Sequence, residues 1–154
     1  MQDRMTGSQM YFRKEFSRIT AFKDGYSFYL QKQNLVQAGF MLHQVLELGF
    51  RVAENILIGK EKFSHSLKNH QVHIRPYCKE LGELFHQSAE LSVLDKIDES
   101  YKAARYEHDF VLSLDELSLA HEKALELIRI LYTCHQQLLA EIAGIDPDHC
   151  RYKS

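Results

Sequence analysis

Three polar residues in an otherwise apolar stretch have the types and the spacing to form a small binding site. His43 and Glu47 are four residues apart, and Gln44 lies between them. On a helix, His43 and Glu47 share one face, and Gln44 and Glu47 share an edge. Such a set predicts a polar pocket that hydrogen-bonds a ligand or a partner subunit. The alternative is a group of interior polar side chains that lock helix packing, together with an ion pair between Glu47 and Arg51.

A second group combines an arginine with two tyrosines. Arg105 lies four residues after Tyr101 and directly before Tyr106. A guanidinium can bind a phosphate through two hydrogen bonds, and a tyrosine ring offers a face on which a base can stack. We therefore predict an anion site in which Arg105 faces a groove near the first polar group, where Glu47 holds the guanidinium. The alternative is core packing of the tyrosines with a tyrosine–arginine stack.

Charge is unevenly distributed along the chain. Residues 60–79 hold five lysines and arginines against Glu61 alone, whereas residues 83–122 hold ten acids against three bases. The net charge is −2, which excludes a generally polycationic nucleic-acid binder, so any anion site must be local. The residues expected at a phosphate- or RNA-binding edge are Lys60, Lys62, His65 and Lys68. Self-association through opposite charges and solvated helix faces without a partner are the alternatives.

No metal site is expected from the sequence. His65, His70 and His73 lie in one segment, but neither a cysteine pair nor a helical His-Glu-x-x-His pattern accompanies them. We interpret these histidines as exposed or as helix caps, and we expect His65 to hold its loop. The three cysteines have no paired spacing, which favours a reducing compartment, the cytoplasm, over a disulfide scaffold.

The elements that carry these groups are predicted to be helices. The chain has 154 residues, of which 45% are hydrophobic, with only two prolines and seven glycines. This composition favours one domain of long helices over a many-stranded sandwich or barrel. Apolar residues at helical spacing predict long helices over residues 8–32, 35–58, 92–107 and from Ser113 to Gly144, with two short helices on either side of Pro76.

The stretch over residues 35–58 has the strongest pattern. Its apolar residues leave only a narrow polar strip, so we expect this helix at the centre of a bundle. Asn34 and Gln37 predict a capping box at its start. The link to the preceding helix is very short, and it predicts that the two helices pack as an antiparallel hairpin.

Together these elements predict an all-α fold, an antiparallel bundle of four to six helices. We expect a single domain over residues 8–145, with flexible ends at 1–7 and 146–154. No apolar run is long enough to cross a membrane, and no signal peptide is visible at the amino terminus.

Three segments resemble a known family. Ala38–Glu47 reads Ala-Gly-Phe-Met-Leu-His-Gln-Val-Leu-Glu and resembles the Ala-x-Phe-x-Leu-His-Gln-x-x-Glu pattern in the second helix of the HEPN domain. Phe63–Leu67 resembles the family's His-Asp-Leu element, with Ser66 where aspartate is usual. Tyr101–Tyr106 resembles its Tyr-x-x-x-Arg-Tyr element. The segments come in the family's order and spacing, and the resemblance covers about residues 10–140.

The resemblance implies a helical bundle, often dimeric, that is fused to or encoded beside a minimal nucleotidyltransferase. The chain has no Gly-Ser pair followed by an Asp-x-Asp strand, so the resemblance makes it the helical partner, as in a toxin–antitoxin-like system, or a detached carboxy-terminal domain. Some members of the family are taken to be non-catalytic nucleotide- or RNA-binding modules. On this basis, the residues expected to bind a ligand are His43, Gln44, Glu47, Tyr101, Arg105 and Tyr106.

Other members of the family are ribonucleases that resemble one another in an Arg-x(4–6)-His motif. There the arginine would hold the scissile phosphate, and the histidine would act as general base or acid on the 2′-hydroxyl. Arg105 lies in the matching segment, but His108 follows it two residues too early. Arg129 and His135 fit the spacing, but their separation turns them to opposite faces of a helix. These departures disfavour catalysis.

Three functions are left open. The first is a non-catalytic HEPN-like module that binds a nucleotide or RNA and serves a nucleotidyltransferase, with no cofactor apart from a nucleotide ligand. The second is a metal-independent ribonuclease toxin of the same fold, with Arg105 and His108 as its catalytic residues. The third is a purely structural helical protein. We expect a homodimer and no association with a membrane.

Overall fold

The structure is a computed structural model that describes residues 2–106 and 109–144. Within these residues it is all-helical, which confirms the predicted all-α bundle, and none of the described helices is long and apolar enough to cross a bilayer. The expected flexible end at 146–154 lies outside the described residues. The helices are α1 (Gln2–Gln31), α2 (Leu35–Leu57), α3 (Leu67–Ile74), α4 (Lys79–Gly82), α5 (Ser88–Tyr106) and α6 (Leu114–Ile142).

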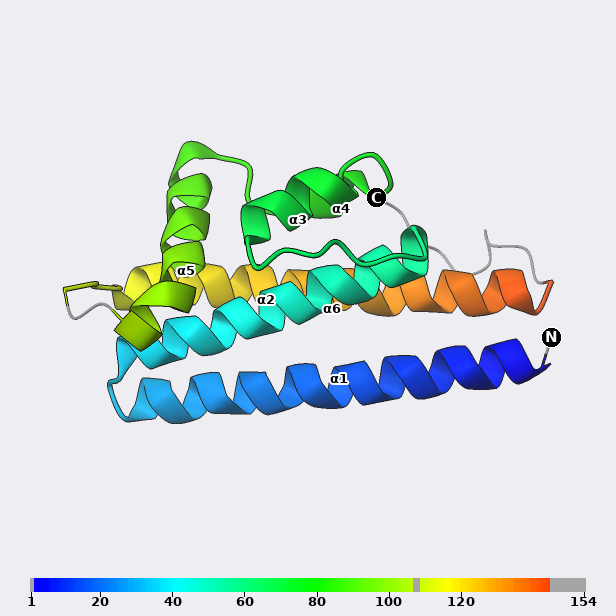
Figure 1. The fold of residues 1–154 in the computed structure, drawn as a ribbon, viewed down its shortest axis with the longest axis horizontal. Helices are drawn as coiled ribbons and strands as arrows, with labels where there is room; N and C mark the ends of the chain where they lie inside the picture. Colours follow the sequence, from blue (N-terminus) through cyan, green and yellow to red (C-terminus); the bar gives the residue numbers. More distant parts are fainter. Residues whose placement is uncertain (1, 107–108, 145–154) are drawn as a thin grey trace.

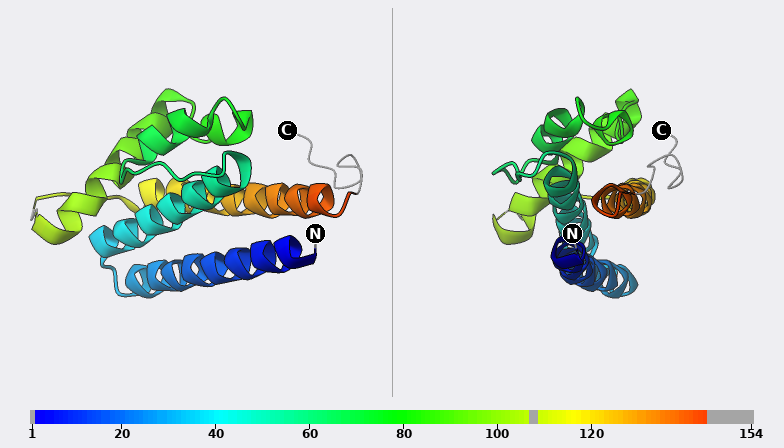
Figure 2. Two further views of the ribbon diagram at one scale, coloured as in Figure 1. Left: turned by 45° about the vertical axis from the view of Figure 1, so that its right-hand side comes forward. Right: turned by 90° about the vertical axis from the view of Figure 1, so that its right-hand side faces the viewer.

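Three long helices form the body of the molecule. α1, α2 and α6 run side by side, and α5 crosses them near one end (Figure 1). α1 and α2 form the expected antiparallel hairpin, whereas α6 runs in the same direction as α2 because the chain returns through α3, α4 and α5 before α6 begins. Figure 2 shows α2 between α1 on one side and α3 to α5 on the other. α2 contacts α1, α3, α5 and α6, so its predicted central position is confirmed.

The buried residues of α2 explain why four other helices pack against it. Leu42 and Leu46 are completely buried, and so are most of the residues from Leu46 to Glu54. Gly49 allows α6 to pack closely, since a Cβ atom at this position would lie 2.5 Å from a methyl carbon of Leu127. A helix that is apolar on most of its circumference is stable only when other elements cover it on several sides.

The helix ends differ from the predictions in two details. The Asn34 side chain accepts a hydrogen bond from the backbone N–H of Gln37, as expected for a cap. The Gln37 side chain does not complete the capping box, because its amide donates instead to the carbonyl of Ala104 on α5 at 3.3 Å. α1 begins at Gln2 instead of the expected Ser8, so residues 2–7 are part of the helix.

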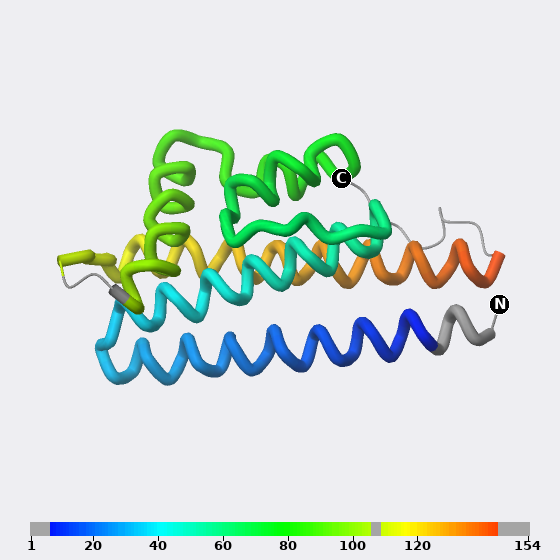
Figure 3. Tube along the Cα trace, in the orientation of Figure 1, coloured from blue at the N-terminus to red at the C-terminus, as the bar shows by residue number. Residues whose placement is uncertain are grey.

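The segment after α2 carries several of the predicted site residues. At Gly59 the backbone adopts a φ of +80°, a left-handed conformation that glycine tolerates best, and α2 ends there. The chain then turns back and runs along α2 until α3 begins at Leu67 (Figure 3). We call residues 59–66 the return loop. It brings His65 next to His43 and Glu47 of α2, which precede it by 22 and 18 residues in the sequence.

Glu90 joins the start of α5 to α6. Its carboxylate accepts hydrogen bonds from the backbone N–H groups of His86 and Gln87 at 3.0 and 3.1 Å. It also forms an ion pair with Lys123 Nζ at 2.7 Å. The hydrogen bond from Lys123, with help from the two backbone N–H groups, lowers the pKa of Glu90 to about 2 against the opposing effect of burial.

This shift predicts a pH-dependent contribution to stability. Because the pKa of Glu90 is lower in the folded chain than its ordinary value of 4.5, the contribution is complete above that pH and is lost as the pH falls toward 2. We expect Glu90→Gln to lower the free energy of unfolding by about 1–2 kcal/mol at neutral pH and to have little effect near the folded-state pKa. Urea unfolding of both proteins across this range measures the difference. A difference that stays constant with pH would contradict the prediction.

Candidate functional site

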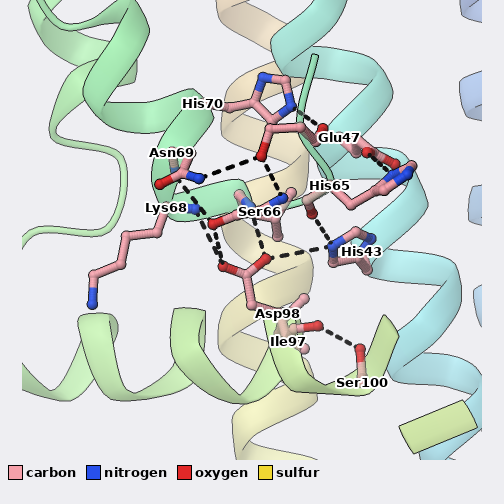
Figure 4. Close-up of polar contacts among 12 residues, drawn as sticks. His43, Glu47, His65, Ser66, Lys68, Asn69, His70, Ile97, Asp98 and Ser100 are labelled. Carbon is pink, nitrogen blue, oxygen red and sulfur yellow. Dashed lines mark hydrogen bonds and ion pairs between the residues drawn. The ribbon is translucent and has the colours of Figure 1, made fainter. Parts of the chain in front are cut away.

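Asp98 of α5 fixes the amino end of α3. Its carboxylate accepts hydrogen bonds from the backbone N–H groups of Leu67 at 2.7 Å and Lys68 at 3.3 Å, and from the Ser66 hydroxyl at 3.4 Å. On the side of α2, His43 Nε2 lies 3.4 Å from the same carboxylate. Figure 4 shows Asp98 between the first turn of α3 and His43. One acidic side chain therefore joins α2, α3 and α5, and it satisfies the N–H groups that a helix leaves free at its start.

His43 is completely buried, and both of its ring nitrogens are bonded within the chain. Its Nε2–H donates to the backbone carbonyl of His65 at 2.9 Å, and its Nδ1 lies 3.2 Å from the side-chain amide of Gln44. A carbonyl oxygen can only accept, so the Nε2 atom carries a proton. The Gln44 amide also donates to Glu47 at 3.5 Å. In this arrangement His43, Gln44 and Glu47 bond to one another and hold the return loop.

Glu47 is nearly buried and holds two basic side chains. One of its carboxylate oxygens lies 2.8 Å from His65 Nδ1 and 3.3 Å from Arg51 Nη2. The expected ion pair between Glu47 and Arg51 is thus confirmed, and so is the expectation that His65 holds its loop. The expectation that Glu47 holds Arg105 is wrong, because this carboxylate is bound to His65 and Arg51, whereas Arg105 lies over the ring of Tyr101.

Tyr101 makes contacts with several side chains, among them His65 and Arg105. The His65 ring is nearly parallel to it, with 4.8 Å between the ring centroids and 17° between the planes. The Arg105 guanidinium carbon lies 4.6 Å from the Tyr101 centroid and 5.9 Å from that of Phe40. The alternative of a tyrosine–arginine stack is therefore present in the structure. We call His65, Tyr101 and Arg105 the Tyr101 stack.

Among the described residues, no ion pair occupies the guanidinium of Arg105. Its side chain is exposed, and within residues 2–106 and 109–144 it makes cation–π contacts but no ion pair. Stacking uses the face of a guanidinium and leaves the N–H groups at its edge free to bind a carboxylate or phosphate. The Tyr106 side chain and His108 lie outside the described residues. The structure therefore does not describe the Arg105–His108 pair that the ribonuclease alternative requires.

The predicted basic edge is only partly available for a ligand. Lys60 and Lys68 are exposed, and His65 has a side chain that is 58% exposed. Lys68 forms an ion pair with Asp95 at 3.2 Å, which neutralises part of the edge. Lys62 donates its backbone N–H inward, and no ion pair of its ammonium group is present among the residues described. The edge therefore lies along the return loop and the first turn of α3, beside the Tyr101 stack.

A buried acid–histidine pair beneath the return loop was not predicted. Glu54 and His70 are both completely buried, with 2.7 Å between Glu54 Oε2 and His70 Nδ1. The other oxygen of Glu54 accepts the backbone N–H of Lys62 at 2.9 Å, and His70 Nε2–H donates to the carbonyl of Ser64 at 2.7 Å. The interpretation of His70 as exposed or capping is therefore wrong. The charge of Glu54 within the apolar part of α2 is the sequence feature that could have indicated a buried partner.

A cleft between α1 and α6 was also not predicted. It has a volume of about 340 Å³, and a neighbouring cavity of about 190 Å³ shares Phe12 and His135 with it. The two rings stack at 3.8 Å, and burial lowers the pKa of His135. The residues around the cleft are Gln9, Phe12, Arg13, Phe16, Tyr132, His135 and Leu139. Aromatic rings and the exposed Arg13 side chain line it, so it is an alternative place for a small molecule.

The other residue types that could do chemistry, namely the Arg129–His135 pair and the cysteines, do not form a further site. Arg129 forms an ion pair with Glu80 at 3.4 Å, whereas His135 faces α1, so the two lie on different sides of α6 as expected. Cys78 and Cys134 are buried thiols that are not part of a disulfide. The hydrogen bond between the Cys134 thiol and Cys78, together with burial, raises the pKa of Cys134, which keeps this thiol protonated. In the part of the chain that the structure describes, no three His, Cys, Asp or Glu residues form a metal site.

The comparisons with known proteins add no relative. No protein-family model matches the chain, and no curated protein matches it. The resemblance to the HEPN family therefore rests on the three sequence segments alone.

Proposed function

We propose that this chain is a non-catalytic HEPN-like module that binds a nucleotide or RNA, forms a homodimer in the cytoplasm and serves a minimal nucleotidyltransferase. The observation that carries the ligand-binding part is Arg105. Its exposed guanidinium lies 4.6 Å from the ring of Tyr101 and has no ion pair among the described residues. A cation held against an aromatic ring can accept a phosphate at its edge while a base stacks beside it.

The surroundings of Arg105 support a site that is organised before a ligand binds. His65 stacks on Tyr101, and its position is set by Glu47 through the side chain and by His43 through the backbone carbonyl. A ligand that meets a prearranged surface loses less free energy to the ordering of side chains. His43, Gln44 and Glu47 serve this arrangement by holding the return loop, whereas Tyr101, Arg105 and His65 face the ligand.

The charges near the stack support an anionic ligand. Arg51 contributes a second guanidinium, which touches the same oxygen of Glu47 as His65 does. Its Nε–H is buried and has no hydrogen-bond partner within the described residues. Glu47 is neutralised by its own two partners, so it does not oppose a phosphate.

The homodimer and the nucleotidyltransferase partner rest on the family resemblance of the three sequence segments. The cytoplasmic location rests on the cysteine composition of the chain. The ribonuclease alternative requires His108 at a spacing that the nucleases of the family do not use, so it stays the second choice.

Binding to a labelled single-stranded oligoribonucleotide and to ATP tests the proposal. We expect Arg105→Ala to weaken binding of the better of these two probes at least about tenfold, because a charge-assisted hydrogen bond contributes about 1.5–3 kcal/mol. Arg105→Lys should recover only part of the affinity, since an ammonium lacks the planar fork. Fluorescence anisotropy measures RNA binding, and calorimetry measures ATP binding.

Arg18→Ala is the matched control. Arg18 is also exposed and helical, but it lies on α1 and pairs with Glu15 at 3.1 Å, so its loss should leave binding unchanged. Circular dichroism must show the same helicity for all variants. If Arg105→Ala binds both probes as the wild type does, or if the wild type binds neither, the ligand-binding proposal fails. RNA cleavage that persists in chelator and is lost in His108→Ala would establish the ribonuclease alternative instead.

A further inference from the structure

Phe63 is a fully exposed aromatic side chain on a segment that is otherwise held in place. Its exposed fraction is 100%. The residue before it, Lys62, is bonded through its backbone N–H to buried Glu54, and the residue after it, Ser64, is bonded through its carbonyl to buried His70. An exposed ring on a mobile loop would fold back onto the protein surface at little cost. Here both neighbours are fixed, so the backbone presents the Phe63 ring to the solvent.

The flanks of Phe63 are basic. Lys60 and Lys62 lie on either side of Glu61, and neither lysine forms an ion pair within the described ranges. Glu61 itself accepts a hydrogen bond from Asn55 at 2.6 Å, so its carboxylate is held toward α2. We call Lys60, Lys62 and Phe63 the basic patch: one apolar side chain next to two positive charges.

A second exposed apolar group has acidic flanks. Val111 and Leu114 are 72% and 61% exposed. Asp109 and Asp115 stand on either side of them, are exposed, and form no ion pair with any residue that the structure describes. We call Asp109, Val111, Leu114 and Asp115 the acidic patch.

The acidic patch is also built on a fixed backbone. Leu112 is 2% exposed, and a Cβ atom on Gly39 would lie 2.3 Å from its methyl carbon, so the segment before α6 packs tightly against α2 here. Ser113 caps α6 through a complete capping box with Glu116. With Leu112 turned inward and Ser113 fixed, Val111 and Leu114 are presented outward.

We infer that the basic patch of one copy of this chain docks onto the acidic patch of a second copy. The two patches match in both respects that an interface requires: an apolar centre on each side, and opposite charges at the rim. They lie at different places on the chain, the first along α2 and the second where α6 begins (Figure 3). In the two-fold pair that we infer, the basic patch of each copy meets the acidic patch of the other, so the same contact forms twice. This inference rests on the homodimer of the proposed function but not on its ligand.

Single-stranded RNA stacked on Phe63 is the alternative occupant of the basic patch. Two observations favour the second copy. RNA would use the basic patch but leaves the presented Val111 and Leu114 without a partner, whereas a second copy covers both patches at once. In addition, the two patches carry equal numbers of opposite charges, which is the complementarity expected of surfaces that meet each other.

A charge-swap experiment tests the inference. The first variant, Lys60→Glu with Lys62→Glu, makes both patches acidic, and the second variant, Asp109→Lys with Asp115→Lys, makes both basic. Light scattering after size exclusion should give a dimer for the wild type and a monomer for each variant alone. An equimolar mixture of the two variants should give a dimer again, because each acidic surface then meets a basic one. A fold defect cannot produce this recovery on mixing.

A second experiment removes the apolar side chain of the basic patch. Phe63→Ser should give a monomer, while Phe28→Ser, which removes an exposed phenylalanine from α1, should leave the dimer intact. A monomeric wild type, or variants that stay dimeric, would overturn the inference. So would a mixture that remains monomeric. If Phe63→Ser abolishes RNA binding without changing the mass, the basic patch is an RNA surface and the inference fails. Loss of ligand binding in Arg105→Ala with normal charge-swap behaviour would support the proposed site and this interface separately.

Discussion

Replacing Glu54 by alanine is expected to lower the free energy of unfolding by about 3–5 kcal/mol, because it removes one partner of a buried pair. Glu54 and His70 are completely buried, and their side chains are 2.7 Å apart. The variant leaves the Nδ1 atom of His70 and the backbone N–H of Lys62 without their partner. Neither group can reach water without opening the return loop. Urea unfolding followed by circular dichroism measures the loss.

Two further variants test whether the loss of the buried pair causes the fall in stability. Glu61→Ala removes an exposed carboxylate from the same loop and should cost less than about 1 kcal/mol. Glu54→Leu combined with His70→Leu replaces both partners by apolar groups, so it should be less destabilising than Glu54→Ala alone. A loss below about 1 kcal/mol in Glu54→Ala would contradict the account, since the removal of one partner of a buried pair costs several times more.

Leu46→Ala is expected to lower the free energy of unfolding by about 2–5 kcal/mol. Leu46 is completely buried in the middle of α2, which α1, α3, α5 and α6 surround. The substitution removes apolar contacts and leaves a cavity that four packed helices cannot easily close. Urea unfolding measures the loss. The unfolding free energy should fall with urea concentration at the same slope as in the wild type, because the native fold is unchanged.

Leu125→Ala is the matched control for this prediction. Leu125 is the same residue type, also lies in a long helix, and is 43% exposed, so its truncation removes less buried surface. We expect a loss within about 0.5 kcal/mol, as is usual for substitutions at the surface. Equal losses in the two variants would show that α2 is not the centre of the core.

The fold could be predicted from the sequence to a large extent because helical periodicity is a local property. The apolar pattern of residues 35–58 predicted both the helix and its central position, and Ser113 and Gly144 marked the two ends of the last helix. The direction of α6 could not be predicted in this way. It depends on how far the chain travels through α3, α4 and α5, which no local pattern records.

The candidate site could be predicted only in part. A tyrosine–arginine stack was the alternative to the predicted anion site at Arg105, and the structure contains this stack. The partner of Glu47 was assigned wrongly because His65 reaches it from the return loop, whose path is not periodic. The buried position of His70 depends on Glu54 in another helix, so the sequence of its own segment does not reveal it.

The cleft between α1 and α6 shows the same limit. Phe12 and His135 are far apart in the sequence, and their rings come together only because both helices lie beside α2. Each residue alone fits an ordinary amphipathic pattern. Because this cleft is an alternative place for a small molecule, a test of the proposed site must distinguish the two locations.

The most direct test of the Tyr101 stack as the ligand site is an NMR titration of isotope-labelled protein with a short oligouridylate and, separately, with ATP. Backbone amide signals report which residues a ligand approaches. The account predicts that the largest shifts lie at His65, Tyr101 and Arg105 and in the return loop, and that Arg105→Ala removes them. Shifts centred on Phe12 and His135 in the α1–α6 cleft, or no shifts with either probe, would contradict it.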